Sequence, residues 1–151
     1  MTQDRWIILA LVGTAALLAG AFLFQALGYA PCQMCYWQRY PHVVALIAGV
    51  AALALGRPGF ILIGAVASFT TGAIGLFHSG VEQKWWDGPA SCSGGGLGNL
   101  DGASLLSVDV MDKVVMCDEI SWAFVGLSMP TWNAILSFCI VGLWVKAWLT
   151  R

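Results

Sequence analysis

Four long apolar runs constrain this chain more than any other feature of its sequence. The first, Trp6 to Leu27, has 22 residues and no charge, enough for a helix that crosses a bilayer. Similar runs lie at about 36–55, 60–77 and 132–149. Charged residues make up only 10% of the 151 residues, against roughly 25% in soluble domains. We therefore predict an all-α membrane protein, a four-transmembrane-helix bundle that forms one domain over residues 1–151 and has the lipid bilayer as its main partner.

The runs themselves carry two further signals. The first run is too long for the apolar core of a secretory signal peptide, so we expect it to remain as a span. Within the third run, small residues recur every four positions, at Gly64, Ser68 and Gly72. This spacing places them on one helix face and predicts close packing against a neighbouring helix.

The connections between the runs differ in character. A short one covers about 28–35, and a long one, about 80–130, contains seven of the eight acidic residues together with Cys92, Cys117 and a glycine-rich stretch at 93–99. We expect the long connection to face solvent, with a short surface helix within 105–115. A net charge of -1 without a basic run lacks the electrostatic signature of a nucleic-acid-binding protein.

An even number of spans places both termini on one side of the membrane and all four loop cysteines on the other. The basic residues favour cytoplasmic termini by a small margin: Arg5, Arg57, Lys146 and Arg151 against Arg39, Lys84 and Lys113. Because disulfides persist in oxidising compartments, we expect the cysteine-bearing side to be the extracytoplasmic one.

Cys32 and Cys35 form a CxxC motif at the predicted start of the second helix. Unpaired N–H groups and the helix dipole favour a thiolate at such a position. Arg39 follows one turn later on the same face, where its charge is expected to lower the pKa of Cys35. His42 continues this polar stripe, and the stripe predicts the lining of a pocket for a small electron acceptor.

Other interpretations of these residues compete with redox chemistry. A zinc site would need a second ligand pair with metal-like spacing, which Cys92 and Cys117, 25 residues apart, do not supply; we predict no metal. A structural disulfide between them could contribute about 3 kcal/mol, whereas a CxxC loop closes too little chain to stabilise much and is typical of exchange-active cysteines.

Cys139, in the fourth run, is expected to be a small buried apolar residue. His78 is expected to be a polar residue at the membrane interface.

Taken together, these motifs resemble the DsbB family of bacterial disulfide bond formation proteins, which keep DsbA oxidised by using quinone. The resemblance covers nearly the whole chain: four spans, Pro31-Cys32-x-x-Cys35 with Arg39, His78 before Cys92, and the run from Cys117 to Trp132. Pro41, His42 and the glycine-rich segment after Cys92 depart from the family pattern.

The resemblance implies a relay in the bacterial inner membrane, with both termini cytoplasmic. Cys92 and Cys117 would oxidise a DsbA-like periplasmic partner and pass its electrons to Cys32 and Cys35, and from there to ubiquinone or menaquinone. It further implies that quinone lies beside Cys35, with Arg39 assisting and His78 nearby. Two alternatives remain: a structural tetraspan protein with inert disulfides, and a quinone reductase similar to vitamin K epoxide reductase.

Overall fold

The computed structural model describes residues 2–89, 92 and 116–151. The glycine-rich stretch at 93–99 and the expected surface helix within 105–115 lie outside the described residues. Four long helices make up most of the rest: α1 (Gln3–Ala26), α2 (Gln33–Leu55), α3 (Gly59–Glu82) and α5 (Met129–Leu149). All four are long and apolar enough to cross a membrane, so the predicted four-helix membrane fold is confirmed.

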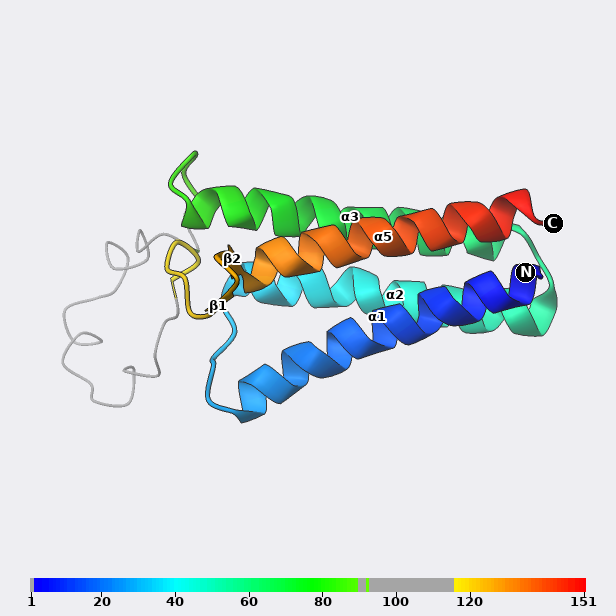
Figure 1. Ribbon diagram of the computed structural model, residues 1–151, viewed down its shortest axis with the longest axis horizontal. Helices are drawn as coiled ribbons and strands as arrows, with labels where there is room; N and C mark the ends of the chain where they lie inside the picture. Colours follow the sequence, from blue (N-terminus) through cyan, green and yellow to red (C-terminus); the bar gives the residue numbers. More distant parts are fainter. Residues whose placement is uncertain (1, 90–91, 93–115) are drawn as a thin grey trace, which may run out of the picture.

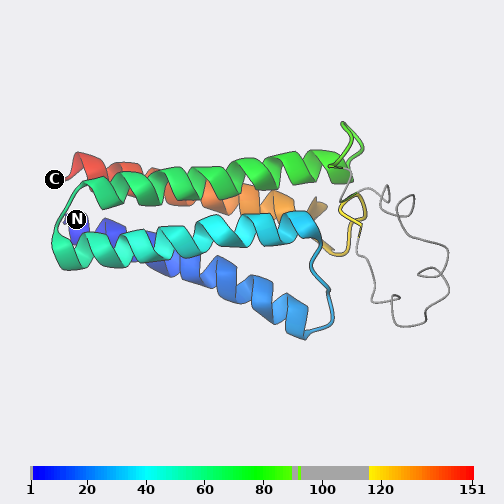
Figure 2. The ribbon, with the colours of Figure 1, turned by 180° about the vertical axis from the view of Figure 1, so that it is seen from behind.

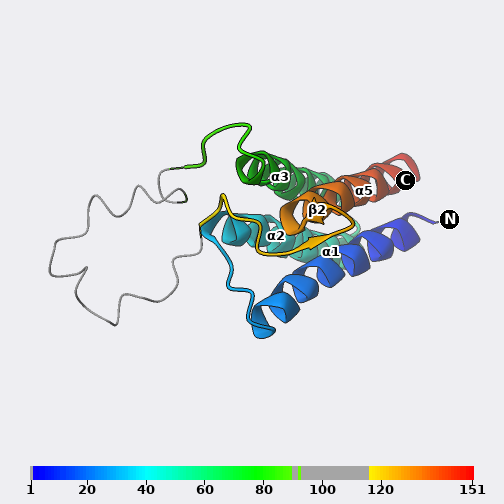
Figure 3. The same cartoon turned by 60° about the vertical axis from the view of Figure 1, so that its left-hand side comes forward.

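The helices run side by side, with both chain termini at one end of the bundle and the connection between α3 and α5 leaving from the other (Figure 1, Figure 2). Helix α3 packs against α2 and α5, while α1 contacts α2 and α5. Toward its C-terminal end α1 diverges from the other three helices, as Figure 3 also shows. This divergence opens the bundle at the end that carries the cysteines.

The small residues of α3 pack as their spacing predicts. Trp144 of α5 is completely buried, its indole Nε1 donates to Ser68 Oγ at 3.0 Å, and its ring lies over Gly64. Phe138 packs against Gly72 one turn further along. Because these positions have small side chains, an aromatic ring fits between α3 and α5, and its polar atom is satisfied inside the membrane.

The helix ends differ from the predicted boundaries on the cysteine side. Helix α3 continues past the expected end at 77 to Glu82, whereas α2 begins at Gln33, in agreement with the predicted helix start at the CxxC motif. A short antiparallel hairpin, β1 (Ala123–Phe124) and β2 (Leu127–Ser128), precedes α5 within the connection that was expected to be a loop. Val125 and Gly126 form its turn with φ of 53° and 76°, the pattern of a two-residue hairpin turn.

Candidate active site

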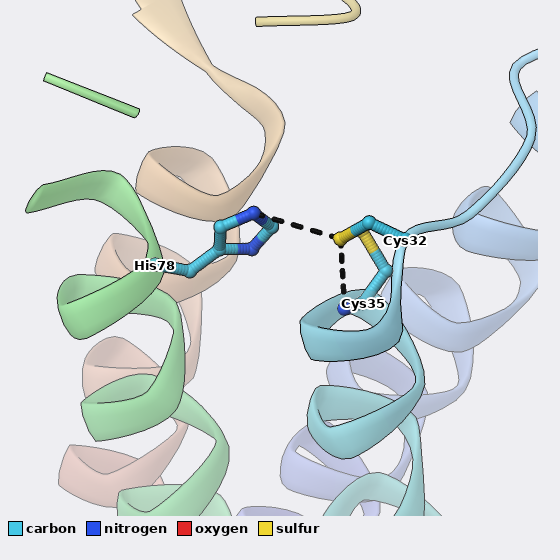
Figure 4. A group of neighbouring side chains, drawn as sticks. All are labelled: Cys32, Cys35 and His78. Carbon is cyan, nitrogen blue, oxygen red and sulfur yellow. Dashed lines mark hydrogen bonds between the residues drawn. The ribbon is translucent and has the colours of Figure 1, made fainter. Parts of the chain in front are cut away.

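The CxxC motif lies at the N-terminus of α2, with Cys32 as the N-cap residue in an extended conformation. Its Sγ accepts a hydrogen bond from the backbone N–H of Cys35 at 3.3 Å, and the two sulfurs lie 2.9 Å apart (Figure 4). This sulfur–sulfur hydrogen bond, together with burial, raises the pKa of the Cys32 thiol above its ordinary value. Burial and the neighbouring sulfur therefore disfavour a resting thiolate at Cys32.

The second pair, Cys92 and Cys117, is joined by a disulfide. The backbone N–H of Cys117 donates to the carbonyl of Cys92 at 3.0 Å. This hydrogen bond adds a second link between the two segments that the disulfide joins. Both residues are buried and share one apolar cluster with Cys32, Met34 and Val81. The structure thus brings the two cysteine pairs, distant in sequence, together at the same end of the bundle, with the half-buried Cys35 packed against the buried cluster of the other three cysteines.

His78 of α3 lies between the two pairs. Its Nε2 is 3.6 Å from Sγ of Cys32 (Figure 4). The same nitrogen is 3.1 Å from the carbonyl oxygen of Cys117. The ring is only 2% exposed, so His78 is a polar residue buried inside the bundle, and its position at the membrane interface stays a prediction. His78 is buried because α3 continues beyond it for another turn.

Two amide side chains, the buried Gln38 and the half-buried Asn133, continue the hydrogen bonding from His78 into the bundle. Gln38 Nε2 lies 3.0 Å from His78 Nδ1, and Asn133 Nδ2 donates to Gln38 Oε1 at 2.8 Å. On its other side, Asn133 Oδ1 lies 2.9 Å from Nε2 of His42. Three helices are linked by this network, since Gln38 and His42 belong to α2, His78 to α3 and Asn133 to α5.

Neither Gln38 nor Asn133 was identified from the sequence as a site residue. The signal that could have found them is their polarity, because an amide inside a membrane span is costly unless it has partners. Gln38 belongs to the same polar region of α2 as Cys35 and Arg39, and Asn133 opens the last apolar run.

Cys32, Cys35 and His78 also form a group whose possible ligand atoms all lie within 4.8 Å of one another. The hydrogen bonding of His78 argues against a metal there. The Gln38 amide occupies Nδ1 as a donor, so the neutral ring carries its proton on Nε2. A protonated nitrogen cannot ligate a metal, and metal-bound histidines use their other nitrogen to donate a hydrogen bond, not to accept one.

A cavity of about 430 Å³ lies beside the CxxC motif, between the diverging α1 and the rest of the bundle. Its walls are mostly apolar and come from α1, the hairpin region and the start of α5. The polar side chains that reach it include the four residues predicted to bind the acceptor, Cys35, Arg39, His42 and His78. Gln38, Glu82 and Asn133, which were not predicted, line it as well. The volume and the small number of polar groups are typical of sites for small organic ligands.

Arg39 lines this cavity but does not pair with Cys35. Its guanidinium donates to Gln25 Oε1 at 2.7 Å and to the carbonyl of Ala21 at 3.3 Å, and it lies over the rings of Phe22 and Tyr36. Within the described part of the chain, its buried Nε has no hydrogen-bond partner. Arg39 therefore connects α2 to α1 at the point where α1 diverges.

The fifth cysteine, Cys139, lies on the outer surface of α5 with a free thiol. The expectation that it is buried was wrong, because apolar residues of a membrane helix are equally stable when they face lipid. Its position in the middle of a span keeps it away from both cysteine pairs.

Comparison with known proteins gives a consistent result. The family model for disulfide bond formation protein DsbB matches residues 3–147. The chain is also similar to three proteins described as disulfide bond formation protein B. It is 33% identical to the one from Polaromonas sp. (strain JS666), 31% to the one from Verminephrobacter eiseniae and 30% to the one from Xanthomonas campestris pv. campestris. Each alignment covers 95% of this chain and 92%, 85% and 91% of the respective relative. No solved structure matches the chain significantly.

Proposed function

Because the chain belongs to the DsbB family and is therefore a membrane thiol oxidase, we propose that it transfers electrons from a thioredoxin-like, DsbA-like partner to a membrane quinone. The observation that carries this proposal is the packing of both cysteine pairs against one another beside a mostly apolar cavity. One pair is a disulfide and the other a hydrogen-bonded dithiol. This is the distribution expected after the loop pair has passed its electrons to the CxxC motif.

The proposed exchange between the pairs has two steps. A thiolate on Cys117 attacks Cys32 of an oxidised CxxC, forming a Cys117–Cys32 bond and releasing Cys35 as a thiolate. The Cys92 thiolate then attacks Cys117, forming the Cys92–Cys117 disulfide and releasing Cys32. The two electrons that came from the partner now belong to Cys32 and Cys35, both of which line the cavity.

The residues around the cavity fit a quinone. A quinone ring is flat and apolar, with two carbonyl acceptors, and the cavity provides apolar walls and the guanidinium of Arg39 as a donor. We assign Cys35, Arg39, His78 and His42 to quinone binding. When bound, quinone supplies the two-electron acceptor. The chain's own part is to hold the ring near Cys35 and to shield it from water by α1 and the hairpin.

We also propose that the protein lies in the bacterial inner membrane, with both termini cytoplasmic and the cysteine end in the periplasm. Thioredoxin-like partners need access to the loop pair, and disulfides persist on the oxidising side of the membrane. The connection between α3 and α5 leaves the bundle at that end (Figure 1).

The experiment that tests this function is partner-dependent quinone reduction by the purified protein in detergent. We expect turnover to require a reduced thioredoxin-like partner and to disappear in Cys32→Ser, Cys35→Ser, Cys92→Ser and Cys117→Ser. Cys139→Ala is the matched control and keeps full turnover, because its thiol lies outside both pairs. Inert disulfides, as in a structural tetraspan protein, would give no quinone reduction with any partner.

The order of transfer predicts which loop cysteine meets the partner. Cys117 contacts His78 through its carbonyl oxygen and lies next to the CxxC motif, so we expect the partner to attack Cys92. A reduced partner that lacks its second active-site cysteine should become trapped as a mixed disulfide through Cys92. Mass spectrometry identifies the linked peptide, and a partner joined mainly to Cys117 would reverse the proposed order.

A further inference from the structure

We propose that Asn133 is a positioning residue for the exchange between the two cysteine pairs. Through Gln38 it holds His78 as the tautomer that donates from Nε2, and this donor stabilises the Cys32 sulfur as it leaves. The inference rests on the proposed relay, in which Cys32 is released when the Cys92–Cys117 disulfide forms. His78 touches the reacting sulfur, whereas Asn133 acts through Gln38.

The orientation of Gln38 is fixed by a backbone carbonyl. Its Nε2 lies 3.2 Å from the carbonyl oxygen of Met34, which can only accept a hydrogen bond. The atom facing that carbonyl is therefore the amide nitrogen, and the same nitrogen donates to Nδ1 of His78 at 3.0 Å. Because Nδ1 accepts, the neutral imidazole has its proton on Nε2.

Asn133 holds Gln38 in this orientation. Its Nδ2 donates to Gln38 Oε1 at 2.8 Å and lies 3.2 Å from Thr71 Oγ1. The Thr71 hydroxyl uses its only proton to donate to the carbonyl of Gln38 at 2.9 Å, so it can only accept from Asn133. Gln38, His78 and Thr71 are all buried, and an amide oxygen left without its donor there would lose a hydrogen bond that water does not replace.

Two N–H groups consequently converge on Sγ of Cys32. One is the backbone N–H of Cys35 at 3.3 Å, and the other is Nε2–H of His78 at 3.6 Å. When Cys92 attacks Cys117 in the Cys117–Cys32 bridge, the sulfur of Cys32 leaves with the electron pair as a thiolate. Donors already aimed at that sulfur stabilise the developing charge without rearrangement.

The same Nε2–H group also lies 3.1 Å from the carbonyl oxygen of Cys117. His78 therefore contacts both residues between which the disulfide bond is exchanged. In the other neutral tautomer, Nε2 would be an acceptor facing a carbonyl oxygen and a thiolate, and both contacts would become repulsive.

The first test needs no variant. The chain has two histidines, so a sample with nitrogen-15 histidine gives signals from only two rings, and a His42→Gln sample assigns them. We expect His78 in the reduced CxxC state to be a single neutral tautomer with the proton on Nε2. A proton on Nδ1 of His78 would overturn the proposal.

The second test is Asn133→Leu, which replaces the donor to Gln38 by a methyl group on a side chain with the same branching and also removes the Oδ1 that faces His42. We expect the His78 signals to become a mixture of tautomers and the exchange between pairs to slow about tenfold, the lower range for a hydrogen bond to a charged group. Ser137→Ala is the matched control. Ser137 Oγ contacts Asn133 only at Oδ1, at 3.4 Å, so both readouts should stay unchanged.

The exchange is followed in the whole protein without quinone. One equivalent of reduced partner is added, the reaction is quenched with acid, and alkylation with mass spectrometry shows which pair carries the thiols at each time. If Asn133→Leu does not fold, Asn133→Ala replaces it. Two results for the Asn133 variant would contradict the positioning role. One is slower exchange between the cysteine pairs while His78 keeps its proton on Nε2. The other is a mixture of His78 tautomers while the exchange rate stays unchanged. A wild-type protein in which no thiols ever reach the CxxC motif would instead refute the relay itself.

Discussion

At the scale of single residues, the two cysteines of the CxxC motif are not equivalent. Cys32 is the N-cap of α2 and is buried against the loop disulfide, whereas Cys35 lies inside the first helical turn and is less buried. The extended backbone of an N-cap residue turns its side chain back toward the first N–H groups of the helix. Both cysteines line the cavity, but helix geometry buries Cys32 within the cluster of the loop pair and leaves Cys35 more exposed at its edge.

The raised pKa of Cys32 predicts how its thiol reacts. In the fully reduced protein, the hydrogen bond with Cys35 and burial keep Cys32 protonated, so alkylation by N-ethylmaleimide should accelerate only at pH values above the ordinary thiol pKa of about 8.5. Because the hydrogen bond is the larger cause, Cys35→Ala should move this acceleration to lower pH. The rate of alkylation as a function of pH, followed by mass spectrometry of the Cys32 peptide, measures the shift. An identical pH dependence in wild type and variant would contradict this assignment.

Arg39 gives a second prediction at this scale. Its guanidinium bonds to Gln25 and to the carbonyl of Ala21 through two different nitrogens, which a single ammonium group cannot reproduce. We expect Arg39→Lys to raise the quinone KM about tenfold and Arg39→Ala to raise it further, because the cavity wall formed by α1 is no longer held to α2. Steady-state kinetics at varied quinone concentration measure this, and an unchanged KM in both variants would show that Arg39 has no part in quinone binding.

At the scale of elements, hydropathy predicts which segments are helices but not where they end. The expected third span stopped at 77 because His78, Ser79 and Gly80 lower the local hydropathy. In the bundle these residues remain helical, since His78 bonds to Gln38 and Ser79 Oγ lies 2.5 Å from Thr131 Oγ1. Hydrogen-bond partners on other helices compensate the cost of burying these polar groups. A hydropathy analysis of one segment at a time cannot identify such partners. The hairpin was missed for a related reason, because Val125 at φ 53° is not a typical turn residue.

The packing of α3 against α5 predicts the effect of one added methyl group. A Cβ at Gly64 would lie 2.6 Å from the ring of Trp144, so Gly64→Ala should destabilise the folded protein by about 1–3 kcal/mol. Gly142→Ala on α5 is the control, because its Cβ would meet no atom within 4 Å and alanine favours the helix. Reversible unfolding in mixed detergent micelles measures both, and equal stability of the two variants would contradict the proposed tight packing.

At the scale of the whole molecule, the residues of the candidate site whose side chains have distinctive chemistry could be predicted from the sequence. The CxxC motif, the second cysteine pair and Arg39 stand out by residue type and spacing. The link from His78 through Gln38 to Asn133 does not, because it depends on three helices meeting at one depth of the bundle. Single polar residues in three different spans suggest partners, but only the tertiary arrangement decides which amide faces which ring.

The arrangement of the whole chain also predicts its orientation in the membrane. Both termini lie at one end of the bundle, and the cysteine pairs lie at the other (Figure 1). After mild reduction, a membrane-impermeant maleimide added to cells with a permeable outer membrane should therefore label Cys92 and Cys117. In a variant without the native cysteines, an exposed cysteine introduced by Thr2→Cys should be labelled only once the inner membrane is opened. Cys139 should resist the reagent from both sides, because its thiol lies in the middle of a span, where lipid and not water surrounds it. Labelling of Thr2→Cys in intact cells, with Cys92 and Cys117 protected, would place the loop disulfide in the cytosol and reverse the orientation.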